Sequence, residues 1–307
     1  MTQSLKIGLV GLDTSHAVAY SQLLNLDENK DLFPGGRVAV AFPGGNPEWA
    51  MSWDRVDGFT ARLGDEFGVT IVNSVEQVAQ QSDLVFITAV DGRQHLELYE
   101  QIAPSGRPVF IDKPFTTNLK DAQVILRRSH EVGAPVMSCS ALRYAETFTK
   151  ALRDDSLGPI VGVEVFGPMT IEDTLPGFLW YGCHGVEMAV AAMGPGCRHV
   201  QVLSRADADI LAMAWEDGRV ATYRGLRNAH TQFGAIIHRE KGFQAVDVSS
   251  ASKPYYHSLL EAILRSLPEG RSDVPEAEML EVVRLMVEGN ALRAGSGART
   301  LEPLNLA

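Results

Sequence analysis

The sequence predicts an α/β protein with a doubly wound, mostly parallel sheet, followed by an α+β domain whose sheet is largely antiparallel. Up to about residue 138, short apolar runs alternate with amphipathic helical stretches, which is typical of parallel strands joined by crossover helices. After that point, several strand-like segments follow one another through tight turns, which favours antiparallel pairing. We therefore predict one domain over residues 1–138 and a second over residues 139–307, whose C-terminal helices can pack back on the first.

The first domain is predicted to contain six strands and five helices. Ser74 and Asn118 are good capping residues for two of the helices, and Gly133 ends the helix that Asn118 caps. The predicted strands are Leu5–Val10, Arg37–Phe42, Val69–Val72, Asp83–Thr88, Val109–Ile111 and Pro135–Cys139. The predicted helices are Ala17–Leu26, Asp54–Phe67, Val75–Gln81, Arg93–Ala103 and Leu119–Glu131.

The second domain mixes helices with hairpins. Glu216-Asp217-Gly218 and Lys241-Gly242 have the composition of hairpin turns. The predicted strands are Ile160–Phe166, Arg198–Leu203, Asp209–Trp215, Arg219–Arg224, Phe233–Arg239 and Phe243–Val248. The predicted helices are Arg143–Asp154, Trp180–Met193, Tyr256–Leu267 and Glu276–Arg293, although Gly182 and Gly185 weaken the start of the second.

Composition excludes several classes of function. The formal net charge of the 307 residues is −11, and no dense run of Lys and Arg occurs, so we expect no nucleic-acid partner. No apolar run reaches membrane-spanning length, and the first residues are typical of a strand rather than a signal peptide, so we expect a cytoplasmic protein. The three cysteines are too few and too scattered for a disulfide framework or a four-thiolate zinc site, and we assign no metal site.

The strongest candidate site follows the strand Val109–Ile111. This strand ends in Asp112-Lys113-Pro114, at the edge where open α/β sheets bind their ligands. Pro114 has no N–H to donate and biases Lys113 towards an extended backbone, which would hold the lysine at the end of the sheet. The alternative is an ordinary strand end with a solvated Asp and Lys.

A second candidate is the loop after the first strand. A strand, a Gly-containing turn and a helix form the opening unit of a nucleotide-binding fold. Relative to the motif G-x-G-x-x-G, Asp13 and His16 replace the second and third glycines. An ionised Asp13 would face a diphosphate at close range, whereas Thr14 and Ser15 could donate to phosphate at the start of the helix. Asp13 as a plain helix N-cap is an equally good interpretation.

Several segments together resemble one known family. They are IGLVG, DLVFIT with His95 beyond it, VFIDKPFTTNLKDAQVI, SALRYAETF and the closing HSLLEAILRSL…VPEAEMLEVVRLM. The chain resembles the glucose–fructose oxidoreductase and inositol dehydrogenase family (Gfo/Idh/MocA), with Asp-Lys-Pro in place of that family's Glu-Lys-Pro. The resemblance implies a Rossmann-type dinucleotide-binding first domain, a substrate and oligomerisation second domain, and NAD or NADP as cofactor. The cofactor-binding residues that it implies are Gly8, Gly11, Leu12, Asp13, Thr14, Ser15, His16, Thr88, Ala89, His95, Asp112, Lys113 and Pro114.

The same resemblance selects residues of the second domain. It implies that Lys113 moves the proton of the reacting hydroxyl and that His184 is the catalytic histidine. Family dehydrogenases usually place an Asp four residues before that histidine, where this chain has Trp180. Glu187, three residues after His184, would share its helical face and could orient the imidazole or share a metal with it. The alternative is a packing helix whose histidine bonds to a backbone partner.

The predicted catalytic residues are therefore Lys113, His184 and Tyr181, the last being the nearest titratable hydroxyl. The predicted substrate-binding residues are Arg143, Tyr144, Trp180, His184 and Glu187. For Arg143 and Tyr144, a salt bridge between the domains is the alternative.

Three functions remain open from the sequence. The leading one is an NAD(P)-dependent oxidoreductase that transfers hydride between nicotinamide and a sugar, polyol or related hydroxyl compound. The second is a non-redox, metal-assisted lyase or isomerase, built from side chains such as Asp13, His16, His95 and Glu187 in one crevice. The third is a ligand-binding sensor without catalysis. The open face of the second sheet further predicts a homodimer or homotetramer, because that face commonly forms an interface in the family.

Overall fold

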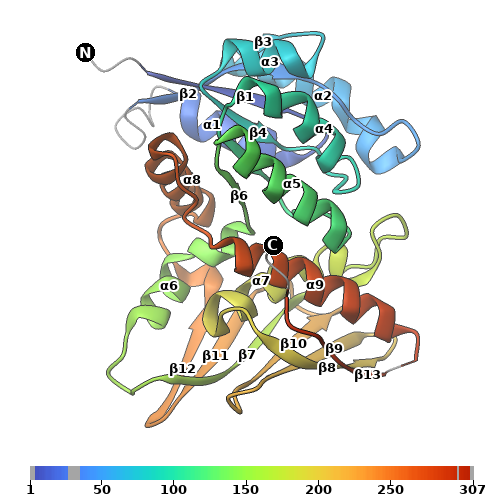
Figure 1. Cartoon of the computed structure of the whole chain (residues 1–307), viewed down its shortest axis with the longest axis vertical. Coiled ribbons are helices and arrows are strands. Elements are labelled where there is room, and N and C mark those ends of the chain that lie inside the picture. Colours follow the sequence, from blue (N-terminus) through green and yellow to red (C-terminus); the bar gives the residue numbers. More distant parts are fainter. Residues whose placement is uncertain (1–3, 27–34, 296, 305–307) are drawn as a thin grey trace. The chain divides into compact units, whose positions relative to one another are not determined.

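The computed structural model describes residues 4–26, 35–295 and 297–304, which form two compact units. The first unit comprises the described residues up to Thr116, with Lys120–Cys139 and Leu259–Val274. The second comprises Thr117–Leu119, Ser140–Ser258 and the described residues from Pro275 onwards. Each unit contains one sheet (Figure 1).

The first unit is a doubly wound parallel sheet, so the predicted fold class is confirmed. Its strand order is β3-β2-β1-β4-β5-β6, and every neighbouring pair is parallel. This order is that of the Rossmann fold. The strands are β1 (Leu5–Val10), β2 (Gly36–Phe42), β3 (Thr70–Ile71), β4 (Leu84–Ile87), β5 (Val109–Ile111) and β6 (Val136–Ser138).

Helices connect these strands and cover the sheet. Right-handed crossovers place α1 and α2 on one face and α3 and α4 on the other, and the helices of each pair are in contact. The central strands are apolar on both sides, and side chains such as Phe86 and Phe110 have no exposed surface. The helices are α1 (Ser15–Asn25), α2 (Ala50–Phe67), α3 (Val75–Gln81), α4 (His95–Ile102) and α5 (Leu119–Val132).

The helix α8 (Tyr255–Ser266) adds its later turns to the first unit. Leu264 lies over Gly36 of β2, where a Cβ atom would come within 3.2 Å of the leucine side chain. Ser266 lies beside Met137 of β6, with 3.9 Å between the hydroxyl oxygen and the sulfur. Along the sequence, the chain thus returns to the first unit after it has contributed Ser140–Ser258 to the second.

The second unit is built on a seven-stranded sheet of order β12-β11-β7-β10-β9-β8-β13. All neighbouring strands are antiparallel except β7 and β10, which are parallel. The strands are β7 (Ile160–Pro168), β8 (Cys197–Ser204), β9 (Ala208–Trp215), β10 (Val220–Leu226), β11 (Gly234–Arg239), β12 (Gly242–Asp247) and β13 (Ala298–Thr300).

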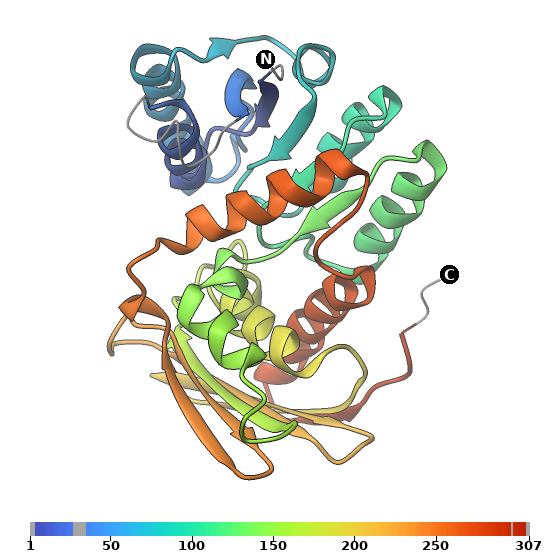
Figure 2. The same ribbon diagram turned by 90° about the vertical axis from the view of Figure 1, so that its left-hand side faces the viewer.

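One face of this sheet packs against helices, as Figure 2 shows. Along β9, Leu211 and Met213 are buried, whereas Ala212 and Ala214 on the opposite face are only half-buried. This alternation distinguishes a covered face from an open one. The helices of the unit are α6 (Glu146–Arg153), α7 (Gly182–Met193) and α9 (Glu276–Arg293), with short 3-10 helices at Ala141–Tyr144 and Gly177–Leu179.

Several predicted boundaries need correction, including that of the helix predicted from Asp54, which begins at Ala50, and one strand was not predicted. The helix predicted from Arg93 begins at His95, because Asp91 accepts the Arg93 N–H in a turn before it. The helix predicted from Arg143 begins at Glu146, and the preceding residues form a 3-10 turn. The strand β13 was not predicted, since its exposed residues carry no apolar pattern and it forms by pairing with β8.

Candidate functional site

In the first sheet, the strand order reverses between β1 and β4, which is where doubly wound sheets bind their ligands. Gly11 follows β1 and lies directly against the loop after β4. Its φ is +94°, and a Cβ atom there would stand 2.5 Å from the backbone nitrogen and Cα of Ala89. The Thr88 hydroxyl also donates to the Gly11 carbonyl at 2.6 Å. Only glycine fits this position, which brings the two loops together.

The side chain of Asp13 points into the protein. It has no exposed surface, and its two oxygens accept the Val90 N–H at 2.9 Å and the Ser52 hydroxyl at 2.6 Å. Burial raises the pKa of Asp13, although these two hydrogen bonds act in the opposite direction. The interpretation of Asp13 as the N-cap is wrong: Thr14 is the N-cap of α1, and its hydroxyl accepts the His16 N–H at 3.4 Å. Asp13 therefore presents no exposed negative charge at the start of α1.

A buried polar network continues from Asp13 to the loop after β2. Ser52 accepts the backbone N–H of Asn46 at 2.7 Å, and the Asn46 amide donates to Asp91 at 2.8 Å. Burial would raise the pKa of Asp91, but hydrogen bonds from Arg93 and Asn46 outweigh it and the pKa is lowered. Ser52, Asn46 and Asp91 were not predicted from the sequence to form a site. Asn46-Pro47 and Asp91-Gly92 are typical of turns. The sequence does not show which side chains these residues contact in the folded protein.

His16 and Asp112 form a buried pair between α1 and the end of β5. The Nδ1 atom of His16 is hydrogen-bonded to one Asp112 oxygen, and the other oxygen accepts the Lys113 N–H at 2.8 Å. Burial would raise the pKa of Asp112, but the charges and hydrogen bonds of His16 and Lys113 outweigh it and the pKa is lowered. Asp112 is only 3% exposed, so the interpretation as a solvated Asp is wrong. The Lys113–Pro114 peptide bond is cis.

Two residues predicted to bind the cofactor are buried inside the first unit. His95 has no exposed surface, and its ring nitrogens lie 3.0 Å from the Phe115 carbonyl and 2.8 Å from the Ala89 carbonyl. Gly8 lies within β1, where a Cβ atom would come 2.3 Å from Val78 of α3. We therefore propose that His95 links the loops after β4 and β5 by hydrogen bonds to their carbonyls. Gly8 lets α3 pack closely against β1.

The other residues of the loop after β1 differ in how far their side chains are exposed to solvent. Leu12 is buried, and its N–H donates to the Pro43 carbonyl. Thr14 is also buried, whereas Ser15, the first residue of α1, is exposed. The backbone N–H groups of the first turn of a helix are not used by the helix itself, so they favour an anion.

In the second unit, the helix α7 begins at Gly182, two residues later than predicted. Trp180 therefore lies outside the helix and is 7% exposed, with its carbonyl accepting from the Cys183 thiol. Tyr181 is the N-cap residue and is 37% exposed, and its ring centroid lies 5.7 Å from that of His184. Trp180 thus does not share a helical face with His184, as an Asp four residues earlier in a helix would.

The imidazole of His184 is hydrogen-bonded to a side chain. Its Nδ1 lies 2.6 Å from the Ser140 hydroxyl oxygen, at the start of the 3-10 helix Ala141–Tyr144. The ring of Phe233 lies against the imidazole, with 5.5 Å between the centroids. Ser140 is 1% exposed and was not identified from the sequence, because it lies 44 residues from His184.

Glu187 pairs with Arg143, at 2.8 Å from the Arg143 Nη1 atom to a carboxylate oxygen. The other end of the guanidinium contacts Glu278 of α9. Burial raises the pKa of Glu187, while Arg143 acts to lower it. All three residues belong to the second unit, so these two ion pairs of Arg143 are not the salt bridge between domains that was the alternative. Tyr144, half-buried, is the last residue of the 3-10 helix.

The described residues contain neither a candidate metal site nor a candidate membrane span. No group of three or more His, Cys, Asp or Glu side chains is placed to hold a metal ion within residues 4–26, 35–295 and 297–304. In the same ranges, no helix is both long enough and apolar enough to cross a membrane.

Comparison with solved structures shows that the fold is shared over nearly the whole chain. Apo scyllo-inositol dehydrogenase from Lactobacillus casei is 15% identical, with a TM-score of 0.79 and coverage of 98% of this chain and 99% of that chain. Myo-inositol dehydrogenase from Lactobacillus casei, in complex with NAD(H) and myo-inositol, is 11% identical, with a TM-score of 0.76 and coverage of 99% and 98%. An oxidoreductase from Agrobacterium radiobacter, in complex with NAD+, L-tartaric acid and magnesium, is 17% identical, with a TM-score of 0.75 and coverage of 97% and 98%.

Comparison of sequences gives the family. No curated protein matches the sequence. Residues 6–139 match the model of the oxidoreductase family with an NAD-binding Rossmann fold, GFO_IDH_MocA. This matched family binds NAD, in agreement with the predicted cofactor. Residues 6–139 therefore carry the NAD-binding Rossmann domain of the Gfo/Idh/MocA family of oxidoreductases, in agreement with the strand order of the first sheet.

Proposed function

We propose that this protein is an NAD(P)-dependent dehydrogenase that oxidises a hydroxyl group of a sugar, polyol or related compound. The observation that carries the proposal is the placement of Lys113 at the carboxyl end of β5, with its backbone fixed by the buried carboxylate of Asp112. A lysine at this edge of a doubly wound sheet is positioned for the ligand-binding side of the fold. The first unit would then bind the cofactor and the second the substrate.

The first loop is compatible with a dinucleotide despite its missing glycines. Asp13 is turned inwards, so its charge does not oppose a diphosphate at the start of α1. We propose that the N–H groups at Thr14 and Ser15, with the dipole of α1, hold the diphosphate. Gly11 keeps the loops after β1 and β4 in contact beside them, together with Thr88 and Ala89. When bound, nicotinamide supplies the hydride acceptor at C4.

Lys113 and His184 are proposed to act on the reacting hydroxyl. Oxidation of an alcohol removes a hydride from the carbon and a proton from the oxygen, and one side chain must accept that proton. Asp112 accepts the Lys113 N–H at 2.8 Å, which fixes the lysine backbone at the end of β5. Tyr181 is exposed next to His184 and is proposed to contact the substrate.

The substrate class is proposed from hydroxyl chemistry and from the neighbours. The Lactobacillus casei neighbour is in complex with myo-inositol and the Agrobacterium radiobacter neighbour with L-tartaric acid, and both compounds carry several hydroxyl groups. In this chain, Arg143 is only 12% exposed and is engaged by Glu187 and Glu278. We therefore propose that Arg143 shapes the substrate site, while Tyr144 and Tyr181 contact substrate.

Titration with NADH and with NADPH, followed by nicotinamide fluorescence, tests the cofactor. We expect saturable binding of at least one nucleotide, followed by turnover of a compound from a panel of inositols, sugars, polyols and hydroxy acids. Lys113→Ala should abolish turnover and retain nucleotide binding by the α1 terminus. Absence of binding to both nucleotides would overturn the dehydrogenase proposal and direct attention to the lyase or sensor alternatives.

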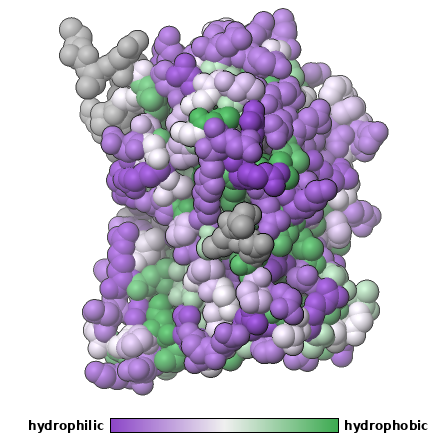
Figure 3. Space-filling view, in the orientation of Figure 1, coloured by the Kyte–Doolittle hydropathy of each residue, from purple (hydrophilic) through white to green (hydrophobic). Residues whose placement is uncertain are grey.

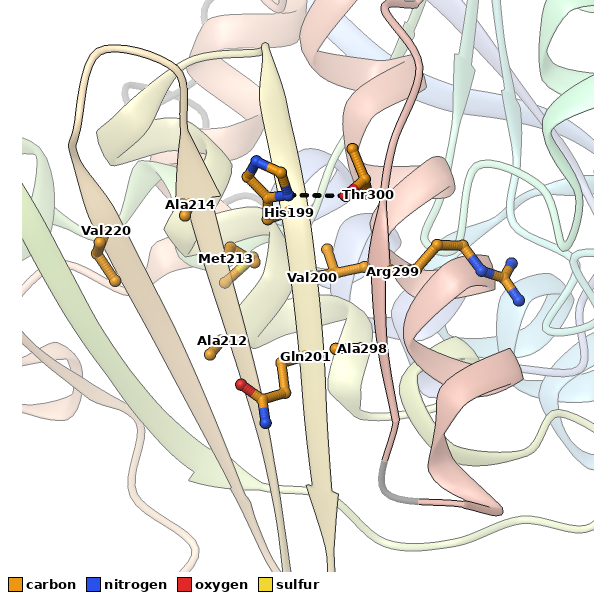
Figure 4. A pocket seen from close by; sticks show the side chains of 10 residues that line it. All are labelled: His199, Val200, Gln201, Ala212, Met213, Ala214, Val220, Ala298, Arg299 and Thr300. Carbon is orange, nitrogen blue, oxygen red and sulfur yellow. Dashed lines mark hydrogen bonds between the residues drawn. The ribbon is translucent and has the colours of Figure 1, made fainter.

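We also propose that the chain forms a homodimer or homotetramer through the open face of the second sheet. A groove of about 330 Å³ crosses this face over β9, β8 and β13, and its lining includes Ala212, Ala214 and Val220 (Figure 4). Figure 3 shows further apolar surface at the β12 end of the sheet, where Phe243 is 66% exposed. An open sheet face with this much apolar surface is more typical of an interface than of a solvated surface.

A further inference from the structure

The partner of His184 decides what this histidine can do. Ser140 supplies a hydroxyl 2.6 Å from the imidazole Nδ1, and the same oxygen accepts the Leu142 N–H at 3.2 Å. Within the described residues these are the two polar groups bonded to that oxygen. Because Ser140 is only 1% exposed, its hydroxyl proton needs a partner inside the protein.

The direction of this hydrogen bond follows from counting donors. A hydroxyl has one proton to donate and two lone pairs to accept with. If Nδ1 carried a proton, the Ser140 oxygen would accept twice and its own buried proton would have no acceptor. If the hydroxyl donates to Nδ1, every group is satisfied, because the oxygen accepts from Leu142 and donates to His184. The neutral imidazole then carries its proton on Nε2.

We propose that Ser140 is a positioning residue that fixes His184 as the Nε2–H tautomer, so that the histidine donates a hydrogen bond to the substrate oxygen rather than removing its proton. This role for His184 rests on the proposed dehydrogenase function, whereas its tautomer does not. Proton removal is then left to the other candidate, Lys113.

Contacts between the start of the 3-10 helix and α7 fix the position of Ser140 relative to His184. Its backbone N–H is also a hydrogen-bond partner of Glu187, one turn of α7 beyond His184. Glu187 is in turn held by Arg143, so the start of the 3-10 helix is attached to α7 at two successive turns. The rings of Tyr181 and Phe233 lie at 5.7 and 5.5 Å from the imidazole and restrict its rotation. Ser140 thereby supplies the orienting group where the chain has Trp180 in place of an Asp.

The first experiment is NMR of protein labelled with ¹⁵N-histidine, recorded where the imidazoles are neutral and without nucleotide or substrate. The signal of His184 is identified as the one lost in His184→Gln. We expect protonated Nε2 and bare Nδ1 in the wild type, and a mixture of tautomers in Ser140→Ala. Ser140→Thr keeps a hydroxyl and should restore the single tautomer.

A second readout separates positioning from folding. Ser140→Ala should lower kcat by about 10- to 100-fold, the range for losing the partner that orients a histidine in metal sites, and leave KM almost unchanged. Ser74→Ala, which removes a comparable N-cap from α3, is the matched control and should leave kcat unchanged.

The outcomes distinguish the two proposals. A wild-type imidazole protonated on Nδ1, or a tautomer that does not change in Ser140→Ala, would overturn the assignment of Ser140. Wild-type protein with the Nε2–H tautomer that binds neither NADH nor NADPH would overturn the dehydrogenase proposal and leave the assignment of Ser140 standing.

Discussion

At the scale of single residues, Gly11 is the position where the first unit tolerates least change. Its positive φ disfavours any side chain, and the site of a Cβ atom lies 2.5 Å from the backbone of Ala89. We expect Gly11→Ala to lower the free energy of unfolding by about 2–4 kcal/mol, because backbone strain and overpacking add. It should also weaken nucleotide binding by separating the loops after β1 and β4.

Urea unfolding checks this prediction, with Gly58→Ala as the control. Gly58 is an exposed residue of α2 with no atom within 4 Å of its Cβ position. Alanine there should raise the stability by roughly 0.5–1 kcal/mol, because glycine is unfavourable inside a helix. Equal stability of Gly11→Ala and the wild type would contradict the proposed close contact.

Asp209 of β9 is a second residue with a defined energetic role. It has no exposed surface, and its carboxylate contacts Arg227 at 3.1 Å and Arg293, the last residue of α9, at 2.8 Å. Burial would raise its pKa, but hydrogen bonds from Arg227, Ser204 and Arg293 outweigh it and the pKa is lowered. A carboxyl with a lowered folded pKa stabilises the protein above its unfolded pKa of about 3.9, and this stabilisation is lost as the pH falls through the folded value.

We expect Asp209→Asn to cost about 3–5 kcal/mol at pH 7, because it removes a fully buried carboxylate that is the counter-charge of two partly buried guanidinium groups. The difference between the variant and the wild type should shrink as the pH falls below 4, and urea unfolding over a pH series measures it. Glu66→Gln is the control: its ion pair with Arg62 is exposed, so its loss should leave the free energy of unfolding almost unchanged. An unchanged difference across the series would show that the Asp209 charge contributes nothing.

At the scale of elements, Gly185 decides how α7 lies on the second sheet. A Cβ atom there would stand 2.1 Å from the ring of Tyr223 on β10, which is fully buried and donates its hydroxyl to the Pro168 carbonyl. In the sequence, this glycine counts only against helix formation. In the fold, it lets α7 approach the sheet closely.

We therefore expect Gly185→Ala to lower stability by about 1–3 kcal/mol through overpacking, although alanine is the better helix former. Adding Tyr223→Leu should recover part of the loss, and a double-mutant cycle by thermal unfolding measures the coupling. Additive effects of the two changes would show that the helix and the ring do not compete for space.

At the scale of the whole molecule, the outer face of the second sheet is left open by the residues that the structure describes. Val220 on this face is 50% exposed and lines the groove over β9. We expect Val220→Arg to reduce the molar mass measured by light scattering from that of an oligomer to that of a monomer, because a buried unpaired charge opposes association. Ile71→Arg, an exposed site in the first unit, is the control and should leave the mass unchanged. A wild-type protein that is already monomeric at high concentration would overturn the proposed interface.

Local pattern was sufficient for most of the fold. The strand Val109–Ile111 and the helix Val75–Gln81 were predicted with their observed boundaries, because an apolar run and a capped amphipathic stretch are properties of neighbouring residues. The resemblance to the family followed from short segments in the same way, and the match over residues 6–139 confirms it for the NAD-binding part. The edge strand β13 was missed, because it has no apolar pattern and exists only by pairing with β8.

The chemistry of individual side chains depended on contacts between distant parts of the chain. The sequence placed Asp13 in the first loop and His184 near the start of a helix. It did not show that the hydroxyl of Ser52, 39 residues after Asp13, donates a hydrogen bond to the Asp13 carboxylate. Nor did it show that Asp112 pairs with His16 across 96 residues, or that Ser140 holds His184 across 44. Secondary structure is encoded by the period of nearby residues, whereas a hydrogen-bond partner is set by which loops the folded sheets bring together, and only the tertiary structure decides that.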